Sequence, residues 1–210
     1  MASSLVQMVG LHVPSASDQS RLTLAEQIPA GKLVEISGGY GSARMTAAVS
    51  IVLHAQQQGE TAAWVQAKGG SLFPPDLRES GVDLESLVVV HVACERDAYA
   101  IPKAAELLLR SGGFGLVVLD LTLRVQPLVQ GAWQGRLLSL AREHQSRVVC
   151  LTDTPGQGAS LGPLIALRIE VRRTRLGPGL FSLHPQLLKN KLGYPFETAE
   201  QTRRAPWGLW

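Results

Sequence analysis

The sequence lacks any apolar run long enough to cross a bilayer. Residues 87–90 and 116–119 are the longest such runs, whereas a transmembrane helix needs roughly 20 apolar residues. The sequence also lacks the basic start and apolar core of a secretory signal, so nothing predicts export. The 210 residues, 45% of them hydrophobic, can bury a full core. We therefore expect a globular protein of the cytoplasm.

Cysteine is scarce as well. Cys94 and Cys150 lie far apart, without a CxxC motif or paired histidines, which argues against a zinc site or a disulfide framework and is typical of a reducing cytosol. We interpret both as buried residues, because free cysteine packs as a small hydrophobe. The net charge of +3 permits nucleic-acid or acidic protein partners without requiring one.

Short apolar runs alternate with helical patterns along most of the chain, which predicts a mostly parallel sheet covered by helices. The predicted strands are residues 33–37, 61–66, 87–92, 115–121 and 147–152, and the predicted helices are residues 22–27, 43–58, 98–111 and 128–144. Two later strand-like runs, 164–174 and 180–188, surround Gly177-Pro178-Gly179 and predict an antiparallel pair at the sheet edge. We divide the chain into an N-terminal extension (1–30), a core domain (31–200) and a tail (201–210).

A glycine-rich stretch follows the first strand of the predicted core. Residues 38–46 read GGYGSARMT and lie between an apolar strand and a predicted helix. A phosphate-binding loop has this context, because its backbone N–H groups at the start of a helix must point at phosphates. The candidate residues of a vestigial phosphate site are Gly38, Gly39, Gly41, Ser42 and Arg44.

The loop departs from the motif G-x-x-x-x-G-K-[ST] at its chemical positions. Ala43 replaces the second glycine, and Arg44 replaces the lysine with a wide planar fork of the same charge. Met45 replaces the hydroxyl residue that binds magnesium, and a thioether is a poor ligand for that hard cation. Thr46 comes one position too late to take its place.

The chain resembles the RecA recombinase core over roughly residues 30 to 200. The stretch "GKLVEISGG" resembles the strand that enters the RecA phosphate-binding loop, and "FGLVVLDL" resembles its Walker B strand, with Asp120 at the aspartate position. Further resembling segments follow in the same order: "GETAAWVQAKGG", "GVDLESLVVV", "LIALRIEVRR" and "LLKNKLGYPFETAE". The resemblance implies an α/β, RecA-like P-loop core with a mostly parallel central sheet, flanking helices and C-terminal antiparallel strands.

Other departures from RecA fall on the same chemical system. Lys68 stands where the resemblance implies the acidic residue that activates water, and Asp153 stands where it implies a γ-phosphate-sensing glutamine. The segments that correspond to both RecA DNA-binding loops are short, as in "TPGQGA" at 154–159. We therefore expect neither ATP hydrolysis nor a bound cofactor. The alternative is a shifted loop in which Arg44 alone holds a nucleotide. If no nucleotide binds, Asp120 is interpreted as a carboxylate retained at a strand end, where it pairs with Arg44.

Length, trimmed ends and an eroded loop are most similar to the ImuA family. That resemblance implies a non-catalytic adaptor in DNA-damage-induced (SOS) mutagenesis, which contacts RecA and the inactive Y-family polymerase ImuB, and through ImuB an error-prone polymerase. It also implies a bacterial protein, nucleoid-associated when it acts. The alternative is a nucleotide-binding or DNA-binding RecA paralogue that modulates RecA filaments in recombinational repair.

Three groups of residues are candidates for partner binding. Lys189 and Lys191 match a RecA segment that faces the neighbouring subunit's nucleotide, or they are merely solvated. Trp207 and Trp210 lie in the sequence "RRAPWGLW", and they either form an interface hot spot or fold back on the domain's own core. A basic cluster is expected to lie at a sheet edge, either as a weak phosphate site or as the polar face of a half-exposed strand; it comprises Arg168, Arg172, Arg173 and Arg175.

Overall fold

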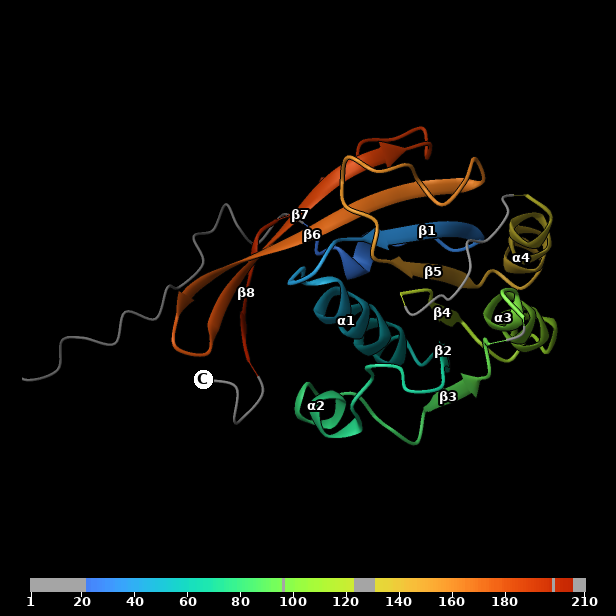
Figure 1. Cartoon of the computed structure of the whole chain (residues 1–210), viewed down its shortest axis with the longest axis horizontal. Coiled ribbons are helices and arrows are strands. Elements are labelled where there is room, and N and C mark those ends of the chain that lie inside the picture. Colours follow the sequence, from blue (N-terminus) through green and yellow to red (C-terminus); the bar gives the residue numbers. More distant parts are fainter. Residues whose placement is uncertain (1–21, 96, 123–130, 198, 206–210) are drawn as a thin grey trace, which may run out of the picture.

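A central eight-stranded sheet organises the computed structural model, which describes residues 22–95, 97–122, 131–197 and 199–205. The strand order is β3-β2-β4-β5-β1-β6-β7-β8, and the strands follow one another down Figure 1 from β7 to β3. The strands are β1 (Lys32–Ser37), β2 (Ala62–Ala67), β3 (Leu87–Val92), β4 (Leu116–Asp120), β5 (Arg147–Thr152), β6 (Ile165–Gly177), β7 (Leu180–Asn190) and β8 (Gln201–Arg204).

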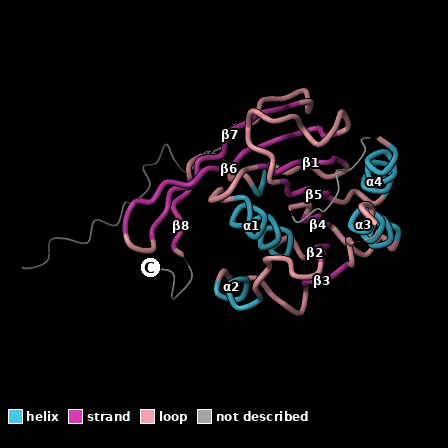
Figure 2. Tube along the Cα trace, in the orientation of Figure 1, coloured by secondary structure: helices cyan, strands magenta, loops and turns pink. Residues whose placement is uncertain are grey.

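Helices cover both faces of the parallel part of the sheet, as Figure 2 shows. They are η1 (Ala25–Gln27), α1 (Arg44–Gln57), α2 (Pro74–Glu79), α3 (Ala100–Arg110) and α4 (Ala132–Glu143). One apolar core lies under η1, α1 and α2, and a second lies under α3 and α4. β1, β2, β4 and β5 are buried on both faces, which explains their nearly continuous apolar sequences, whereas the edge strand β3 is partly exposed. None of the described helices is long and apolar enough to span a membrane.

The long strand β6 leaves the parallel sheet and forms a protruding ribbon. It pairs parallel to β1 up to Glu170 and antiparallel to β7 from Leu167 to Gly177, so its last part is paired with β7 alone. β8 adds to the far side of β7, and this ribbon projects beyond the helices in Figure 1. Gly179 has φ +61°, a conformation that glycine adopts easily at a tight turn.

The α/β fold with C-terminal antiparallel strands is confirmed. Two elements were not predicted. α2 begins with two prolines, which are tolerated in the first turn of a helix but are more typical of a loop in a sequence. β8 has the polar sequence QTRR, which lacks the apolar alternation of a strand. Two segments that the sequence analysis left outside the core also contact it: residues 201–204 form β8, and Leu24, Ala25 and Ile28 are buried in the core under α1.

Of the two cysteines, Cys150 is buried within β5, as expected, but Cys94 is partly exposed after β3. The interpretation of Cys94 as a fully buried residue is therefore wrong. Partial burial and the neighbouring carboxylates Glu95 and Asp97 raise the pKa of its thiol. A raised pKa lowers the thiolate fraction at neutral pH and makes the group less reactive.

Helix α3 provides a matched pair of leucines that tests the core assignment. Leu109 is 1% exposed, whereas Leu107 is 68% exposed two residues earlier. Leu109→Ala should lower the free energy of unfolding by about 2–5 kcal/mol, because it removes buried methyl groups and leaves a cavity. Leu107→Ala should change it by less than about 0.5 kcal/mol. Urea denaturation of both variants measures the difference, and equal losses would contradict the helix orientation.

Candidate functional site

The glycine-rich loop connects the carboxyl end of β1 to the first turn of α1, as the sequence predicts. Gly41 has φ +78°, which glycine tolerates without strain. A Cβ placed on Gly38 would lie 2.5 Å from the Cβ of Ser42, whereas one on Gly39 would meet nothing within 4 Å. The loop thus folds back closely over Gly38 and keeps a glycine requirement there.

The amides at the entrance of α1 are engaged inside the protein. The Ser42 N–H donates to the Gly39 carbonyl at 3.1 Å, and the Ala43 N–H donates to the Val171 carbonyl of β6 at 2.9 Å. Phosphate binding at a helix N-terminus uses free backbone donors of this kind. Two of the donors nearest the helix are therefore already satisfied, and one of them holds the loop to β6.

Arg44 contacts the loop itself. Its Nη1 donates to the carbonyl of Gly38, to that of Gly39 at 3.2 Å and to the Ser42 hydroxyl at 3.4 Å. A guanidinium group only donates hydrogen bonds, so Arg44 binds the carbonyl oxygens of the loop. A phosphate-binding loop instead directs backbone N–H donors at its ligand. The expected pairing of Arg44 with Asp120 is wrong, because no ion pair joins them among the described residues.

Asp120 ends β4 and is only 3% exposed. Its Oδ1 accepts hydrogen bonds from the Thr122 N–H at 3.0 Å and the Thr122 hydroxyl at 2.6 Å. Oδ2 is buried and has no hydrogen-bond partner in the described part of the chain. Lys68 and Asp153 lie exposed just after β2 and β5. Together with Asp120 they lie at the carboxyl edge of the parallel strands, where the RecA resemblance places all three.

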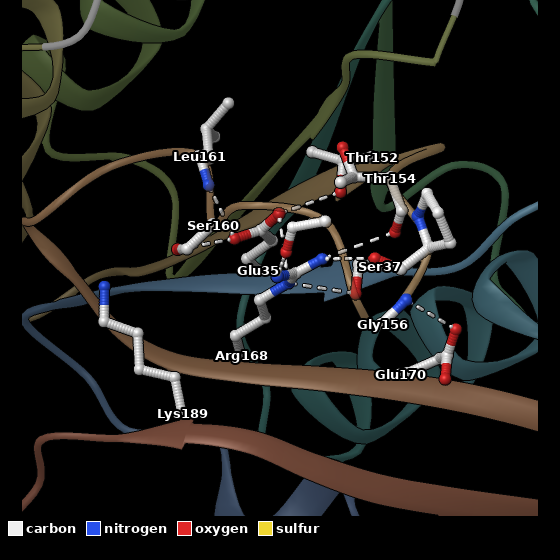
Figure 3. Close-up of polar contacts among 12 residues, drawn as sticks. Glu35, Ser37, Thr152, Thr154, Gly156, Ser160, Leu161, Arg168, Glu170 and Lys189 are labelled. Carbon is white, nitrogen blue, oxygen red and sulfur yellow. Dashed lines mark hydrogen bonds and ion pairs between the residues drawn. The ribbon is translucent and has the colours of Figure 1, made fainter.

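A buried ion pair, which the sequence analysis missed, lies beside the loop. Glu35 in β1 and Arg168 in β6 are opposite each other in register, and both are nearly inaccessible to solvent. The Arg168 Nε lies 3.5 Å from Glu35 Oε1 and also donates to the Ser37 hydroxyl at 3.2 Å. Figure 3 shows both side chains directed toward the segment that joins β5 to β6.

The Glu35–Arg168 pair holds the segment of residues 153–164 against the sheet. Glu35 accepts from the hydroxyls of Thr152 and Ser160, both at 2.9 Å, and from the Leu161 N–H at 3.0 Å. The Arg168 guanidinium donates to carbonyls at both ends of this turn: Gly158 at 2.5 Å, Pro155 at 3.0 Å and Thr154 at 3.4 Å. Buried charges need such complete pairing, because desolvation is costly.

The same segment is held from three further sides. Glu170 accepts from the Gly156 N–H at 3.0 Å, and the Gln134 amide of α4 donates to the Leu161 carbonyl at 3.0 Å. Lys189 donates from Nζ to the Gly162 carbonyl at 2.9 Å. The short connection that the sequence analysis noted at 154–159 is therefore folded onto the domain by side chains of β1, β6, β7 and α4.

Lys189 and Lys191 both face this segment. Lys191 Nζ donates to the Pro163 carbonyl at 3.1 Å, next to the carbonyl that Lys189 contacts. Partial burial lowers the pKa of Lys189, and the neighbouring Lys191 lowers it further. Within this chain, these lysines help to fix the 153–164 segment.

The basic cluster of β6 does not form the predicted sheet edge. β7 and β8 lie beyond β6, and Arg168 is buried in the ion pair. Arg172 pairs with Glu170 at 2.8 Å, and the Arg173 guanidinium stacks over the Phe181 ring at 5.4 Å. Arg175 remains exposed. The two candidate tryptophans, Trp207 and Trp210, lie outside the described residues.

Comparison with known proteins identifies the family. The family model described as the RecA N-terminal domain matches residues 15–151, which is more than half of the chain. The chain belongs to the RecA N-terminal domain family. The proteins named Protein RecA of Chlamydia abortus and Heliobacterium modesticaldum are each 28% identical to it over 82% of this chain and 59% of the relative. Thus the chain spans about three-fifths of the length of these RecA relatives.

A single glutamate within an apolar strand was the signal for the missed ion pair. Glu35 interrupts the run LVEIS, and Arg168 interrupts the run LIALRIEV. A charge in a strand buried on both faces requires a partner, but the sequence does not specify which of the many possible partners is used. The pairing of Glu35 with Arg168 follows from the neighbouring positions of β1 and β6 in this RecA-family sheet.

The buried pair leads to a stability prediction. Arg168→Met leaves the Glu35 carboxylate and several carbonyls of the 153–164 segment without their donor, and should cost about 3–5 kcal/mol of unfolding free energy. Arg175→Met, on the exposed part of the same strand, should cost less than about 0.5 kcal/mol. Urea denaturation compares the two variants. Similar denaturation midpoints would show that the pair does not stabilise the fold.

The loop leads to a second prediction. Gly38→Ala should lower the unfolding free energy by about 1–3 kcal/mol, because its new Cβ meets Ser42 and overpacking forces the backbone to move. Gly39→Ala, with open space around it, is the matched control and should have little effect. Thermal unfolding of both variants provides the measurement; if Gly39→Ala were the more harmful change, the described loop conformation would be incorrect.

Proposed function

We propose that the chain is a non-catalytic RecA-like accessory protein in DNA-damage-induced mutagenesis. In this proposal it serves as an adaptor that contacts RecA and ImuB, and through ImuB an error-prone polymerase for translesion synthesis. Membership of the RecA N-terminal domain family supports the link to RecA. The finer assignment rests on the resemblance to the ImuA family together with the condition of the glycine-rich loop.

The observation that carries the proposal is the internal use of the helix-entrance amides. The Ser42 and Ala43 N–H groups bind carbonyls of the protein, and Arg44 donates to the carbonyls of Gly38 and Gly39. Phosphoryl transfer depends on a held phosphate, a magnesium ion and a positioned water. A loop arranged in this way, followed by Met45 instead of a hydroxyl ligand, supports a role without nucleotide turnover.

The 153–164 segment supports the adaptor role in a second way. The RecA resemblance implies a long DNA-binding loop at this position, whereas this segment is short and bound to Glu35, Arg168, Glu170 and Lys189. A loop fixed to its own domain has fewer free groups to follow a DNA backbone. We therefore assign the interaction to the protein surface and propose that direct DNA binding is weak or absent.

Lys191 is the more accessible of the two lysines proposed as partner contacts. It is exposed after β7; its Nζ donates to the Pro163 carbonyl and its backbone N–H to the Ala166 carbonyl. Lys189 beside it is partly buried and holds the same turn. We propose that Lys191 meets an acidic group of RecA, and that Trp207 and Trp210 belong to the remaining partner candidates.

A nucleotide-binding experiment tests the non-catalytic part of the proposal. Isothermal titration of the full chain with ATP, with and without magnesium, should give no saturable binding, because the loop donors are engaged. RecA under the same conditions is the positive control. Tight, magnesium-dependent binding would overturn the proposal in favour of a nucleotide switch.

A capture experiment tests the adaptor part. The tagged chain, recovered from DNA-damaged bacterial cells, should retain RecA and polymerase subunits. Lys191→Glu should weaken RecA capture several-fold, whereas Lys103→Glu on α3, which is also exposed, should not. Recovery of neither partner would refute the adaptor role, and a salt-dependent shift of single-stranded DNA would instead favour direct DNA binding.

A further inference from the structure

A groove of about 960 Å³ separates the β6–β8 ribbon from α1 and α2, on the side where the ribbon projects in Figure 1. Phe181 and Leu183 of β7 line one wall. The opposite wall contains Leu53 of α1, Leu77 of α2 and Phe73, which precedes α2. The groove does not include the Glu35–Arg168 pair, but it adjoins the glycine-rich loop at Val171, whose carbonyl accepts from the Ala43 N–H.

The groove is lined by apolar and polar residues, and some of its apolar side chains are only partly covered. Phe73 is 58% exposed, and Met45, Leu53 and Leu72 are only partly buried at the edge of the core. Charged side chains of both signs also line it: Arg173, Arg203 and Arg204 on the ribbon side, and Glu26, Asp76 and Glu79 on the side of η1 and α2. An exposed apolar surface with a polar rim is typical of a binding site, and here it would suit a short apolar segment without charged side chains.

The described chain reaches the groove directly after β8. Ala205 lines the groove, and its N–H donates to the Gly179 carbonyl at 2.8 Å, which fixes the point from which the chain continues. Residues 206–210 follow with the sequence Pro-Trp-Gly-Leu-Trp and contain no charged side chain. Five residues extend at most about 17 Å, so this segment stays within reach of the groove.

We propose that residues 206–210 of the same chain occupy the groove, where Trp207, Leu209 and Trp210 cover the apolar walls. An indole ring buries a large apolar area and favours contact with other aromatic rings such as Phe73 and Phe181. The short tether keeps the local concentration of the segment high. This contact does not require any partner protein, and it takes Trp207 and Trp210 out of the partner candidates, which leaves the lysines for the adaptor role.

Residues 1–21 are an alternative occupant, because Thr23 and Leu24, which follow them in the sequence, also line the groove. Twenty-one residues can extend about 70 Å, so their tether concentrates them at the groove far less than the five-residue tether does. Their deletion is therefore the matched control for deletion of residues 206–210.

The first test compares the full chain with the two deletions. Removal of residues 206–210 should lower the melting temperature by about 2–4 °C, as expected for loss of a modest contact in a chain of this size. It should also increase fluorescence of the apolar dye ANS several-fold. The emission of Trp207 and Trp210 is obtained by subtracting the spectrum of the shortened chain from that of the full chain. This emission should be blue-shifted and should resist quenching by acrylamide. Removal of residues 1–21 should change neither the dye signal nor the quenching.

The second test blocks the groove without removing the segment. Leu53→Glu places a charge in the apolar wall and should shift the emission of Trp207 and Trp210 to longer wavelength. In that background, deletion of residues 206–210 should no longer lower the melting temperature. Leu107→Glu, on the exposed face of α3 away from the groove, is the control and should leave both signals as in the unaltered chain.

Each alternative occupant gives a distinct result that would overturn the proposal. A dye increase on removal of residues 1–21 would assign the groove to that segment. A dependence of the quenching on protein concentration would indicate a second copy of the chain. Unchanged melting, dye fluorescence and emission after removal of residues 206–210 would show that the segment does not contact the groove.

Discussion

The ion pair between Glu35 and Arg168 is the interaction on which the centre of this structure depends. Its two charges lie in neighbouring strands and are buried, so each needs a full set of hydrogen bonds to offset desolvation. Those bonds come mostly from residues 152–161. The pair therefore joins β1 to β6 and determines the path of the chain between β5 and β6. One electrostatic requirement in the core thus fixes a connection that would otherwise have many conformations available.

The family fold is retained while the surroundings of its glycine-rich loop are altered. The parallel strands, the loop position and the carboxylate at the end of β4 all lie where a RecA-like core would have them. Within the loop of this chain, Arg44 donates to the Gly38 and Gly39 carbonyls, and the Ala43 N–H donates to the Val171 carbonyl. These contacts stabilise the loop without a ligand. They make its present conformation part of the folded domain.

Much of the fold could be predicted from the sequence, because long periodic segments determine strands and helices locally. The strand at residues 33–37, the helix at 43–58 and the Gly177–Gly179 hairpin are examples. α2 and β8 could not be predicted, since prolines and polar residues adopt these forms only against the rest of the domain. For the site, the loop and Asp120 were located by motif. The partners of Arg44, Glu35 and Arg168 depend on which strands become neighbours, and hydrogen-bond choice among many acceptors is not encoded in residue spacing.

The Ala43–Val171 hydrogen bond also connects the loop mechanically to the ribbon. Val171 lies where β6 leaves β1, and the same strand continues without a break to the turn at Gly177. An anion that used the Ala43 N–H would have to take it from the Val171 carbonyl. An anion in the loop and the present position of β6 would therefore compete for one hydrogen-bond donor, so any binding there would be linked to the position of the ribbon.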